Sequence, residues 1–518
     1  MPYSFILPVV VLVLVVAAIY RRRRNSIAYI QGPSAPSWMF GHMQQLLLAF
    51  RYGEHEFQWL KAYGSVYRLK GCLGQNRLMV SDPVALQYIV NSAHFYRSPL
   101  KDNISYLLFG EKSVITATGS EHRRLRSALN VGFTSAAVRK YQPVFKRIAE
   151  TISEELERNS EPMTDICPLL CTAALGAISE AIMGVPQKDL GQEFVDDTIQ
   201  IVKSSATQTN RDLLVDAVGF HLPGWFWRIV MRLPTATFNT ARTVRSLATE
   251  IGGRIVREKI DATRKGLEIN QDLFSRLVNP ESPTESSKML PEEDIVAHTA
   301  LIVIAGLENT ANALSFGLLE LARHPEFQRD LRTEIHSSPR DADGNIPYDT
   351  MPLLNAFVKE TLRLYPGLPL SDRVVVEDTV IPLGESICTR DGIFTNQIPV
   401  SKGQLVTIAI ASYQRSLPSV WGNDAHEFNP YRWIKGAVHQ GEAVGPYANL
   451  LTFLGGPRTC LGWRFAVSEM QIVFCELVGK FSFAETDTEA TRPRFMTSLQ
   501  PIAENGRKGL PLRIIRTS

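Results

Sequence analysis

The chain lacks an excess of charge of either sign and has few cysteines. Its 518 residues carry a formal net charge of +3, with no lysine-rich arm or repeat, so the composition offers no case for a nucleic-acid partner. The six cysteines are scattered without a pairing rhythm, which favours a reducing compartment over a disulfide framework. An apolar content of 45% with 21% charged residues indicates an ordinary globular interior.

Long Gly/Ser-rich or Pro-rich linkers are also missing. Length alone would suggest about three domains. The sequence offers no such linker to separate three units.

The N-terminal segment, residues 1–20, carries no charged side chain. Residues 5–18 are almost wholly Val, Ile, Leu and Ala, and about 17 to 25 apolar residues can span a bilayer as a helix. Four arginines follow at 21–24, which places that flank in the cytosol by the positive-inside rule. A cleaved signal peptide is the alternative, but its positive charge would precede the apolar run, and no cleavage site is evident. We expect a transmembrane signal anchor over 1–20, then a basic stop and proline-rich hinge over 21–40.

Hydrophobic periodicity predicts a mainly helical body with small β elements near both ends. A helical stretch is expected at 84–90, and the period is helical from about 139 to 329. Alternating runs predict a hairpin and further strands. The predicted strands are 67–70, 77–80, 374–376, 405–409 and a region around 494–502.

One cysteine stands at the end of the glycine-rich loop 453–462, and a helical pattern begins at Trp463. A helix start suits a thiolate, because free N–H groups and the positive end of the dipole favour a negative sulfur. Glycines at 455, 456 and 462 would let the backbone approach a flat partner closely. For a lone cysteine, the alternative is a small buried residue in a tight turn.

The spacing of this loop resembles a known motif. Its fixed residues are Phe453, Gly456, Arg458, Cys460 and Gly462. They match the haem-ligand loop of the cytochrome P450 family, Phe-x-x-Gly-x-Arg-x-Cys-x-Gly, at every fixed position, and the chain as a whole resembles the fungal microsomal members. The resemblance implies a single, mainly α (α+β) catalytic domain over 41–518, in which helical layers enclose haem b. It also implies that Cys460 is the axial ligand of the iron.

A long helix is predicted from about 292 to 324, with Gly306 in its middle. A mid-helix glycine costs about 1 kcal/mol relative to alanine, so close packing or a local distortion should compensate. The segment around Gly306 resembles the oxygen-binding stretch of the family, which implies that Glu308 relays protons. Asn309 stands where the family has threonine, and Thr310 comes one residue late. Because one residue rotates a helical side chain by about 100°, Thr310 cannot simply replace it.

Our interpretation is that a water held by Asn309 and Glu308 completes the relay, since an amide can hydrogen-bond but relays protons less easily than a hydroxyl. From the residues alone, helix packing with a solvent-facing Glu308 stays open.

Glu360 and Arg363 are, by themselves, an ordinary i, i+3 helix pair worth about 0.2–0.5 kcal/mol. Their surroundings resemble the Glu-x-x-Arg helix of the family, which implies a buried pair joined by Arg432. Tyr431 replaces the usual acid of that segment, so one charge partner of the network stays open.

Four residues match family positions that bind the haem propionates: His122, Arg126, Arg373 and Arg458. Arginine forks suit carboxylates geometrically. Arg123 and Arg124 are interpreted as a solvated face or as part of a positive surface for an acidic redox partner.

The resemblance implies that O2 is activated with two electrons from NADPH, delivered by a membrane-bound NADPH-cytochrome P450 reductase. Cytochrome b5 is a further candidate partner. One oxygen atom enters a lipophilic small molecule, such as a terpenoid of fungal secondary metabolism, and the other leaves as water. The expected location is the endoplasmic reticulum membrane, with the catalytic domain cytosolic. Two alternatives stay open: a reductase-independent haem-thiolate isomerase or dehydratase, and a haem protein that only binds a ligand.

By motif alignment, the regions facing the substrate are roughly 96–114, 214–238, 304–308, 367–370 and 496–500. Residues 222–231 are apolar and aromatic, which fits a loop dipping into a bilayer edge. Internal packing is the alternative for this loop.

Overall fold

The computed structural model describes residues 26–517, apart from 159–162, 206–208, 221, 223, 268–270, 280–289, 342–345, 437, 439–440, 442, 487–489 and 497. The predicted anchor over 1–20 lies outside the described residues. Within the predicted hinge, Ile27 and Ile30 are fully buried, and the Arg68 N–H donates to the Gln31 carbonyl at 2.8 Å. Residues 26–31 are therefore packed on the folded body.

Most of the chain is helical. The α-helices are α2 Met43–Leu47, α3 Glu56–Tyr63, α4 Pro83–Asn91, α5 Pro99–Phe109, α6 Gly119–Leu129, α7 Ser135–Arg158, α8 Cys167–Ile178, α9 Gln192–Ser205, α10 Asn210–Gly219, α11 Gly224–Val230, α12 Ala236–Arg264, α13 Leu273–Val278, α15 Glu292–Val296, α16 Thr299–Arg323, α17 Pro325–Ser337, α18 Pro352–Leu364, α19 Ile410–Ser416, α20 Pro418–Trp421 and α21 Trp463–Lys480. The predicted helix at 84–90 is confirmed as α4. Asp82 caps it by accepting from the Ala85 N–H at 2.9 Å, and Pro83 occupies its first turn.

The strands form four small sheets. They are β1 Val66–Lys70, β2 Asn76–Val80, β3 Phe95–Arg97, β4 Thr164–Asp165, β5 Leu370–Val375, β6 Thr379–Cys388, β7 Phe394–Val400, β8 Leu405–Ala409, β9 Phe481–Glu485, β10 Thr491–Phe495, β11 Leu499–Ala503 and β12 Pro511–Arg516. The largest sheet has the order β1-β2-β8-β5-β3, in which β2 and β8 run parallel. The predicted hairpin is confirmed as β1–β2, with Val66 opposite Val80.

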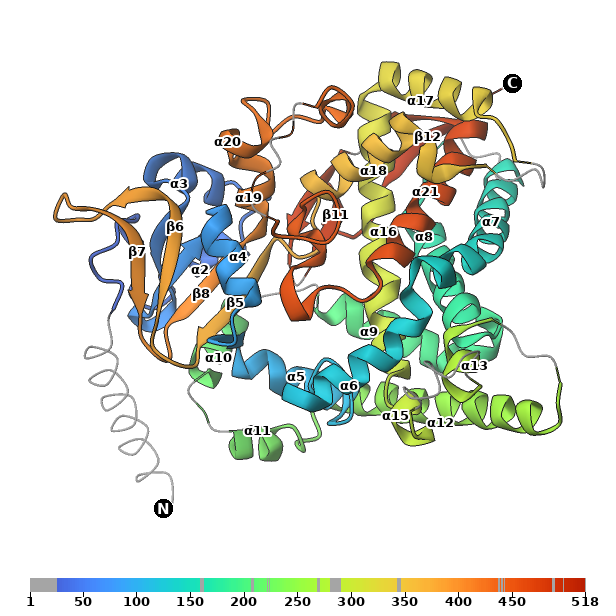
Figure 1. Ribbon diagram of the computed structural model, residues 1–518, viewed down its shortest axis with the longest axis horizontal. Coiled ribbons are helices and arrows are strands. Elements are labelled where there is room, and N and C mark those ends of the chain that lie inside the picture. Colours follow the sequence, from blue (N-terminus) through green and yellow to red (C-terminus); the bar gives the residue numbers. More distant parts are fainter. Residues whose placement is uncertain are drawn as a thin grey trace.

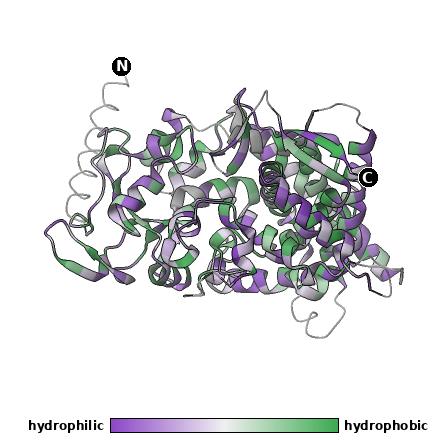
Figure 2. Ribbon diagram, turned by 90° about the horizontal axis from the view of Figure 1, so that it is seen from above, coloured by the Kyte–Doolittle hydropathy of each residue, from purple (hydrophilic) through white to green (hydrophobic). Residues whose placement is uncertain are grey.

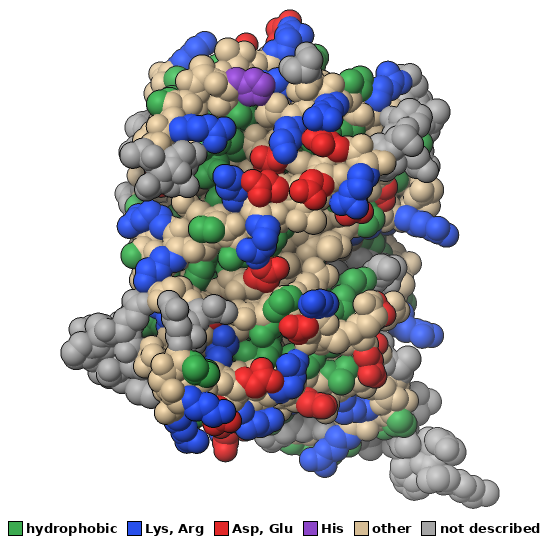
Figure 3. Space-filling view, turned by 90° about the vertical axis from the view of Figure 1, so that its right-hand side faces the viewer, with side chains coloured by type: hydrophobic (Ala, Val, Ile, Leu, Met, Phe, Trp, Pro, Cys, Tyr) green, Lys and Arg blue, Asp and Glu red, His purple; other side chains and the backbone are tan. Residues whose placement is uncertain are grey.

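The molecule has a sheet-rich side and a helical side (Figure 1). The strands β1, β2, β5, β6, β7 and β8 lie with α3 and α4, while α7, α8, α17 and α21 gather around α16 on the other side. Apolar and polar residues share the same helices, as expected for elements with one buried face (Figure 2). On the face that carries α7 and α17, Lys and Arg are interspersed with Asp and Glu (Figure 3).

The helical run predicted over about 292–324 is present over 292–323, with a short interruption that was not predicted. A turn at residues 297–298 separates α15 from α16. The buried His298 ring lies at this break: its Nε2 accepts from the Val114 N–H at 2.9 Å, and its Nδ1 lies 2.6 Å from the Asp294 carbonyl. Since the Val114 N–H can only donate, Nδ1 must carry the ring proton, and the imidazole is neutral.

In the described part of the chain, one helical stretch, 292–323, is long and apolar enough to cross a membrane. It is mostly buried and forms the centre of the domain.

The hairpin β6–β7 was not predicted. Pro382 and Gly384 interrupt β6, and β7 exposes most of its residues, so neither strand shows a clear alternation.

The buried His298 ring is expected to make the thermal stability of the protein depend on pH. Burial lowers its pKa, so below the ordinary histidine value of about 6.5 the unfolded chain binds a proton that the native ring does not. The thermal midpoint is expected to fall as pH decreases from about 7 to about 5, and to fall less steeply in His298→Phe. That variant should also be less stable near pH 7, by about 1–3 kcal/mol, because it leaves the Val114 N–H without an acceptor. Replacing the half-buried His94 by phenylalanine is the control. Identical pH slopes in His298→Phe and the wild type would contradict this assignment.

Candidate active site

The cysteine loop connects a short 3-10 turn, Leu451–Phe453, to the start of α21. The Cys460 N–H donates to the Phe453 carbonyl at 2.8 Å, which closes the loop through its backbone. Gly462 is the residue before the first turn of α21, so the cysteine lies at a helix start as predicted from its position. The buried Phe453 ring lies 6.5 Å from the Trp463 ring.

Cys460 is exposed, whereas the other described cysteines are buried or half-buried. The surrounding protein atoms nevertheless desolvate its thiol and raise its pKa. The Gly462 N–H and the Arg126 charge act in the opposite direction and lower the pKa. This environment combines an accessible sulfur with two groups that stabilise its thiolate form.

The loop glycines differ from the expectation that all three admit a flat partner. A Cβ on Gly455 would meet the Val444 carbonyl oxygen at 2.1 Å, and one on Gly456 would meet the Val90 carbonyl oxygen at 2.1 Å. Gly456 also has a φ of +65°. These two glycines are therefore required by the chain's own backbone. At Gly462 the nearest atom would be 3.7 Å away, so only this position leaves room for another molecule.

Arginines converge beside this loop. Arg97 on β3 is directly opposite Arg373 on β5 in the antiparallel pair. Like charges opposite each other destabilise a sheet unless an anion compensates them. Burial, then the charge of Arg97, lowers the pKa of Arg373 to about 10. Arg458 lies near both arginines. Its charge lowers the pKa of Arg373, and the charge of Arg97 lowers the pKa of Arg458.

His122 and Arg126 on α6 complete this cluster. Burial and the charges of Arg458 and Arg126 lower the pKa of His122 to about 4, so the ring is neutral at pH 7. The guanidinium of Arg458 donates to the Val114 and Ala117 carbonyls at 3.2 and 2.8 Å. Two carboxylates lie near the cluster. Asp102 is 3.6 Å from Arg97, and Asp372 acts on Arg373 but is bound to Arg77 at 2.6 Å, so the cluster keeps surplus positive charge.

These residues fit haem. The four arginines supply forked donors for two propionates, and the surplus charge is what two carboxylates would neutralise. The sulfur of Cys460 supplies the single soft ligand that haem-thiolate proteins use. The residues that would hold haem are Cys460, His122, Arg97, Arg126, Arg373 and Arg458.

Arg123 is exposed, and Arg124 forms salt bridges with Glu121 and Asp294 at 2.7 and 2.6 Å. Arg124 is therefore tied to α15, and of the two it is Arg123 that remains a candidate for a positive docking surface.

A buried ionic network lies behind the cysteine loop. Glu360 accepts two hydrogen bonds from Arg363, both at 2.8 Å, and one from Arg432 at 3.0 Å. The indole N–H of Trp433 and the backbone N–H of Asn429 donate to the same carboxylate at 2.9 and 2.8 Å. Arg363 also donates to the Gln414, Ala425 and Glu427 carbonyls. The network thus joins α18 to the segments that precede the cysteine loop.

The charge partner left open by Tyr431 is Asp424. Its Oδ1 lies 2.9 Å from Arg432 Nη1, so an acid eight residues earlier replaces the acid next to the arginine. The Tyr431 hydroxyl instead donates to Asp330 on α17 at 2.6 Å.

The middle of α16 is continuous α-helix, and the glycine serves packing. A Cβ on Gly306 would meet the Ile178 side chain at 2.4 Å, so the alternative of close packing, not a break in the helix, explains this residue. The exposed Asn309 side chain donates to the Ala305 carbonyl at 3.2 Å, and its Oδ1 lies on the side of Gly367.

Thr310 is buried and therefore does not share the exposed position of Asn309. Glu308 points away from both, toward the hairpin β10–β11, where Ser498 and Gln500 donate to it at 3.1 and 2.6 Å. The alternative of a solvent-facing Glu308 is wrong, because its carboxylate is largely buried.

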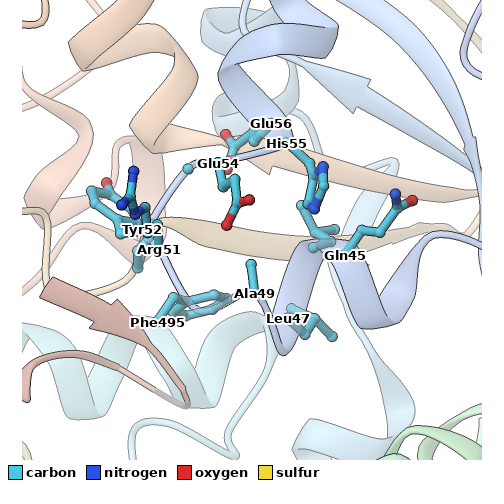
Figure 4. Close-up of a pocket in the computed structure, with 12 residues that line it drawn as sticks. Gln45, Leu47, Ala49, Arg51, Tyr52, Glu54, His55, Glu56 and Phe495 are labelled. Atoms are coloured by element: carbon cyan, nitrogen blue, oxygen red, sulfur yellow. The ribbon is translucent and has the colours of Figure 1, made fainter. Parts of the chain in front are cut away.

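One of the regions expected to face a substrate, 367–370, meets the N-terminal segment at a small pocket, beside a residue that precedes the expected region 496–500. Pro369 and Phe495 line it together with residues 45–47, 49 and 51–56. Figure 4 shows Phe495, Ala49 and Leu47 on one side and Glu54 and His55 on the other. The carboxyl of Glu56 in this lining is buried, which raises its pKa to about 7.

Sequence reasoning missed Arg97, Asp424 and the partners of Glu308. The pairing of Arg97 with Arg373 depends on strand register between segments almost three hundred residues apart. Asp424 has no helical spacing to Arg432, and the chain reverses between them. No local pattern pointed to Arg97, because its three-residue strand β3 was not predicted.

Known proteins are similar to this chain over nearly its whole length. The Cytochrome P450 family model matches residues 30–505. Cytochrome P450 monooxygenase 91 of Postia placenta is 29% identical over 514 residues, covering 94% of this chain and 93% of the relative. Cytochrome P450 monooxygenase 219 of the same fungus is 32% identical over 482 residues, covering 88% and 87%. Ganoderic acid synthetase CYP5150L8 of Ganoderma lucidum is 29% identical over 485 residues, covering 85% and 88%. The chain with the Cys460 loop and the Glu360 network therefore belongs to the cytochrome P450 family, and it is an oxidoreductase of the monooxygenase type.

Proposed function

We propose that this protein inserts one oxygen atom from O2 into a lipophilic small molecule, with electrons from NADPH delivered by NADPH-cytochrome P450 reductase. The accessible Cys460 sulfur beside a surplus of buried arginine charge is the observation that carries this proposal. When bound, thiolate-ligated haem supplies the activation of dioxygen. The chain's own residues anchor the propionates, exclude water and deliver protons.

The proton route is assigned to α16. Glu308 is a largely buried carboxylate, and Asn309 presents its amide on an exposed face one residue away. Because their side chains leave the helix about 100° apart, a water is needed to join them. Thr310 is buried on a different face, so it acts through packing in this proposal.

A lipophilic substrate is supported by exposed apolar residues on α11. Trp225 and Ile229 are 58% and 56% exposed, whereas Trp227 and Met231 are buried. The predicted loop is thus half internal packing and half a surface suited to a bilayer edge. With the apolar residues 1–20, this surface supports a single-pass anchor in the endoplasmic reticulum membrane and a cytosolic catalytic domain.

One relative is named for the synthesis of ganoderic acid, and further relatives are numbered fungal monooxygenases. This supports a role in fungal secondary metabolism, with a terpenoid as the first substrate class to test. Cytochrome b5 is proposed as a second electron donor.

Reconstitution with reductase and NADPH tests the function. Lipophilic candidates are screened for a product heavier by one oxygen atom, formed only when NADPH and reductase are both present. Product formed without either would favour the isomerase or dehydratase alternative. A substrate-induced spin-state change with no product from any candidate would favour a ligand-binding haem protein.

The assignment of Asn309 to the proton route leads to a prediction about how much oxygen is lost as peroxide. Asn309→Ala removes the amide from the exposed face of α16, so the peroxide released per NADPH consumed is expected to rise severalfold. Asn309→Thr, which restores a hydroxyl, is expected to release less peroxide than the alanine variant. An unchanged ratio in Asn309→Ala would remove Asn309 from the proton route.

A further inference from the structure

The carboxylate of Glu308 is held from outside its own helix. It leaves α16 toward β11, which lies beside this helix (Figure 1). Ser498 Oγ and Gln500 Nε2 both donate to its Oε1, at 3.1 and 2.6 Å. Both donors are buried, and Asn312, one turn along α16, donates to the Leu499 carbonyl at 3.0 Å. The hairpin and the helix are therefore joined at the point where the acid lies.

Lys508 approaches the same oxygen from the surface. Its Nζ lies 4.0 Å from Glu308 Oε1, and the lysine side chain is 25% exposed while the glutamate side chain is 12% exposed. A bridge between Ile502 and Lys508 and the hydrogen bond from the Gly509 N–H to the Pro501 carbonyl hold the lysine backbone against β11. A continuous polar route therefore leads from solvent, through the ammonium group, to the buried acid.

Resting on the function proposed above, we propose that Lys508 is a positioning residue for Glu308: it holds the carboxylate ionised and, with Ser498 and Gln500, aimed along the proton route. The ammonium group itself touches neither haem nor substrate in this assignment. Protons enter α16 from the side of the C-terminal hairpin.

The balance of charges supports this role. Burial raises the pKa of Glu308, and Lys508 is the strongest of the groups that lower it, ahead of Ser498, Asn312 and Gln500. The groups that face the carboxylate from α16 and from the hairpin β10–β11 are neutral. The charged group, Lys508, lies in the segment before β12. Removing the lysine charge should therefore keep Glu308 protonated to a higher pH.

The test compares Lys508→Met, Lys508→Arg and the control Arg507→Met. Arg507 is the exposed cation next in the chain, so the control removes the same charge at nearly the same place. The first readout needs no turnover: the infrared absorption of the protonated Glu308 carboxyl is titrated in the haem-loaded protein, with Glu308→Gln as the blank. The second readout is the pH profile of peroxide released per NADPH.

Lys508→Met is expected to move both midpoints upward by roughly one pH unit. Lys508→Arg should restore them, and Arg507→Met should leave them in place. Lys508→Gln serves the same purpose if the methionine variant fails to fold.

An infrared midpoint that is the same in Lys508→Met and Arg507→Met would overturn the proposal. The two proposals fail separately. A wild type that makes no NADPH-dependent product defeats the proposed function and leaves the infrared result standing. Normal turnover with unmoved midpoints in Lys508→Met defeats the role of Lys508 alone.

Discussion

Cys460→Ser is expected to abolish the Soret band that thiolate-ligated haem gives after reduction and treatment with carbon monoxide, and with it all NADPH-dependent product. A serine hydroxyl stays protonated where a cysteine can supply a thiolate, so the anionic ligand is lost. The loop itself should survive, because the backbone bond from residue 460 to the Phe453 carbonyl does not involve the sulfur. Circular dichroism and the thermal midpoint should therefore stay close to those of the apoprotein.

Cys388→Ser is the matched control for this variant. Cys388 is a half-buried free thiol at the end of β6, where it lies 3.5 Å from the Thr389 carbonyl, so serine replaces it at little cost. Its carbon monoxide spectrum should equal that of the wild type. An identical thiolate spectrum in Cys460→Ser would remove the basis for assigning Cys460 as the iron ligand, and the proposed function with it.

Glu360→Ala is expected to yield protein without haem. The substitution leaves two buried arginines, Arg363 and Arg432, facing each other without the carboxylate that both bind. Stranding a buried charge in this way costs about 3–5 kcal/mol. Since the network holds the segments that lead to the cysteine loop, haem content per protein and the thermal midpoint should fall together.

The chain contains a matched control for this experiment as well. Glu326 and Arg329 on α17 have the same i, i+3 spacing, but Glu326 is 89% exposed and the pair is 3.8 Å apart. Glu326→Ala should change stability by less than about 1 kcal/mol and leave haem content unchanged. Glu360→Gln keeps the volume of the side chain and separates the lost charge from lost packing. A stable, fully haem-loaded Glu360→Ala protein would refute the role given to this network.

Local patterns were sufficient for much of the fold. The hairpin β1–β2, helix α4 and strand β8 each lie within a contiguous stretch whose periodicity or turn residues predict it, and the strand region predicted around 494–502 contains β11 and the end of β10. The prediction gave the extent of the helical run over 292–324 and missed the turn at 297–298, where the His298 ring accepts from the Val114 N–H of a distant loop. It missed β6–β7, which pair with each other and expose much of their surface, so burial imposes little pattern on them.

The candidate site divides in the same way. The cysteine loop, the Glu360–Arg363 pair and the positions of Glu308 and Asn309 were identifiable because each motif is short and its spacing is set by a single turn or helix. Arg97, Asp424 and Lys508 were not, since their roles depend on which distant segment lies against them.

By itself the sequence determined the family, the position of the sulfur ligand at a helix start and the mainly helical character of the domain, because these follow from local spacing and periodicity. Only the tertiary structure decided how the charges are balanced: which arginines gather with a surplus of positive charge, which acid completes the Glu360 network and which way Glu308 points. Electrostatic energy depends on distances through space and on burial, and neither can be read from positions along the chain.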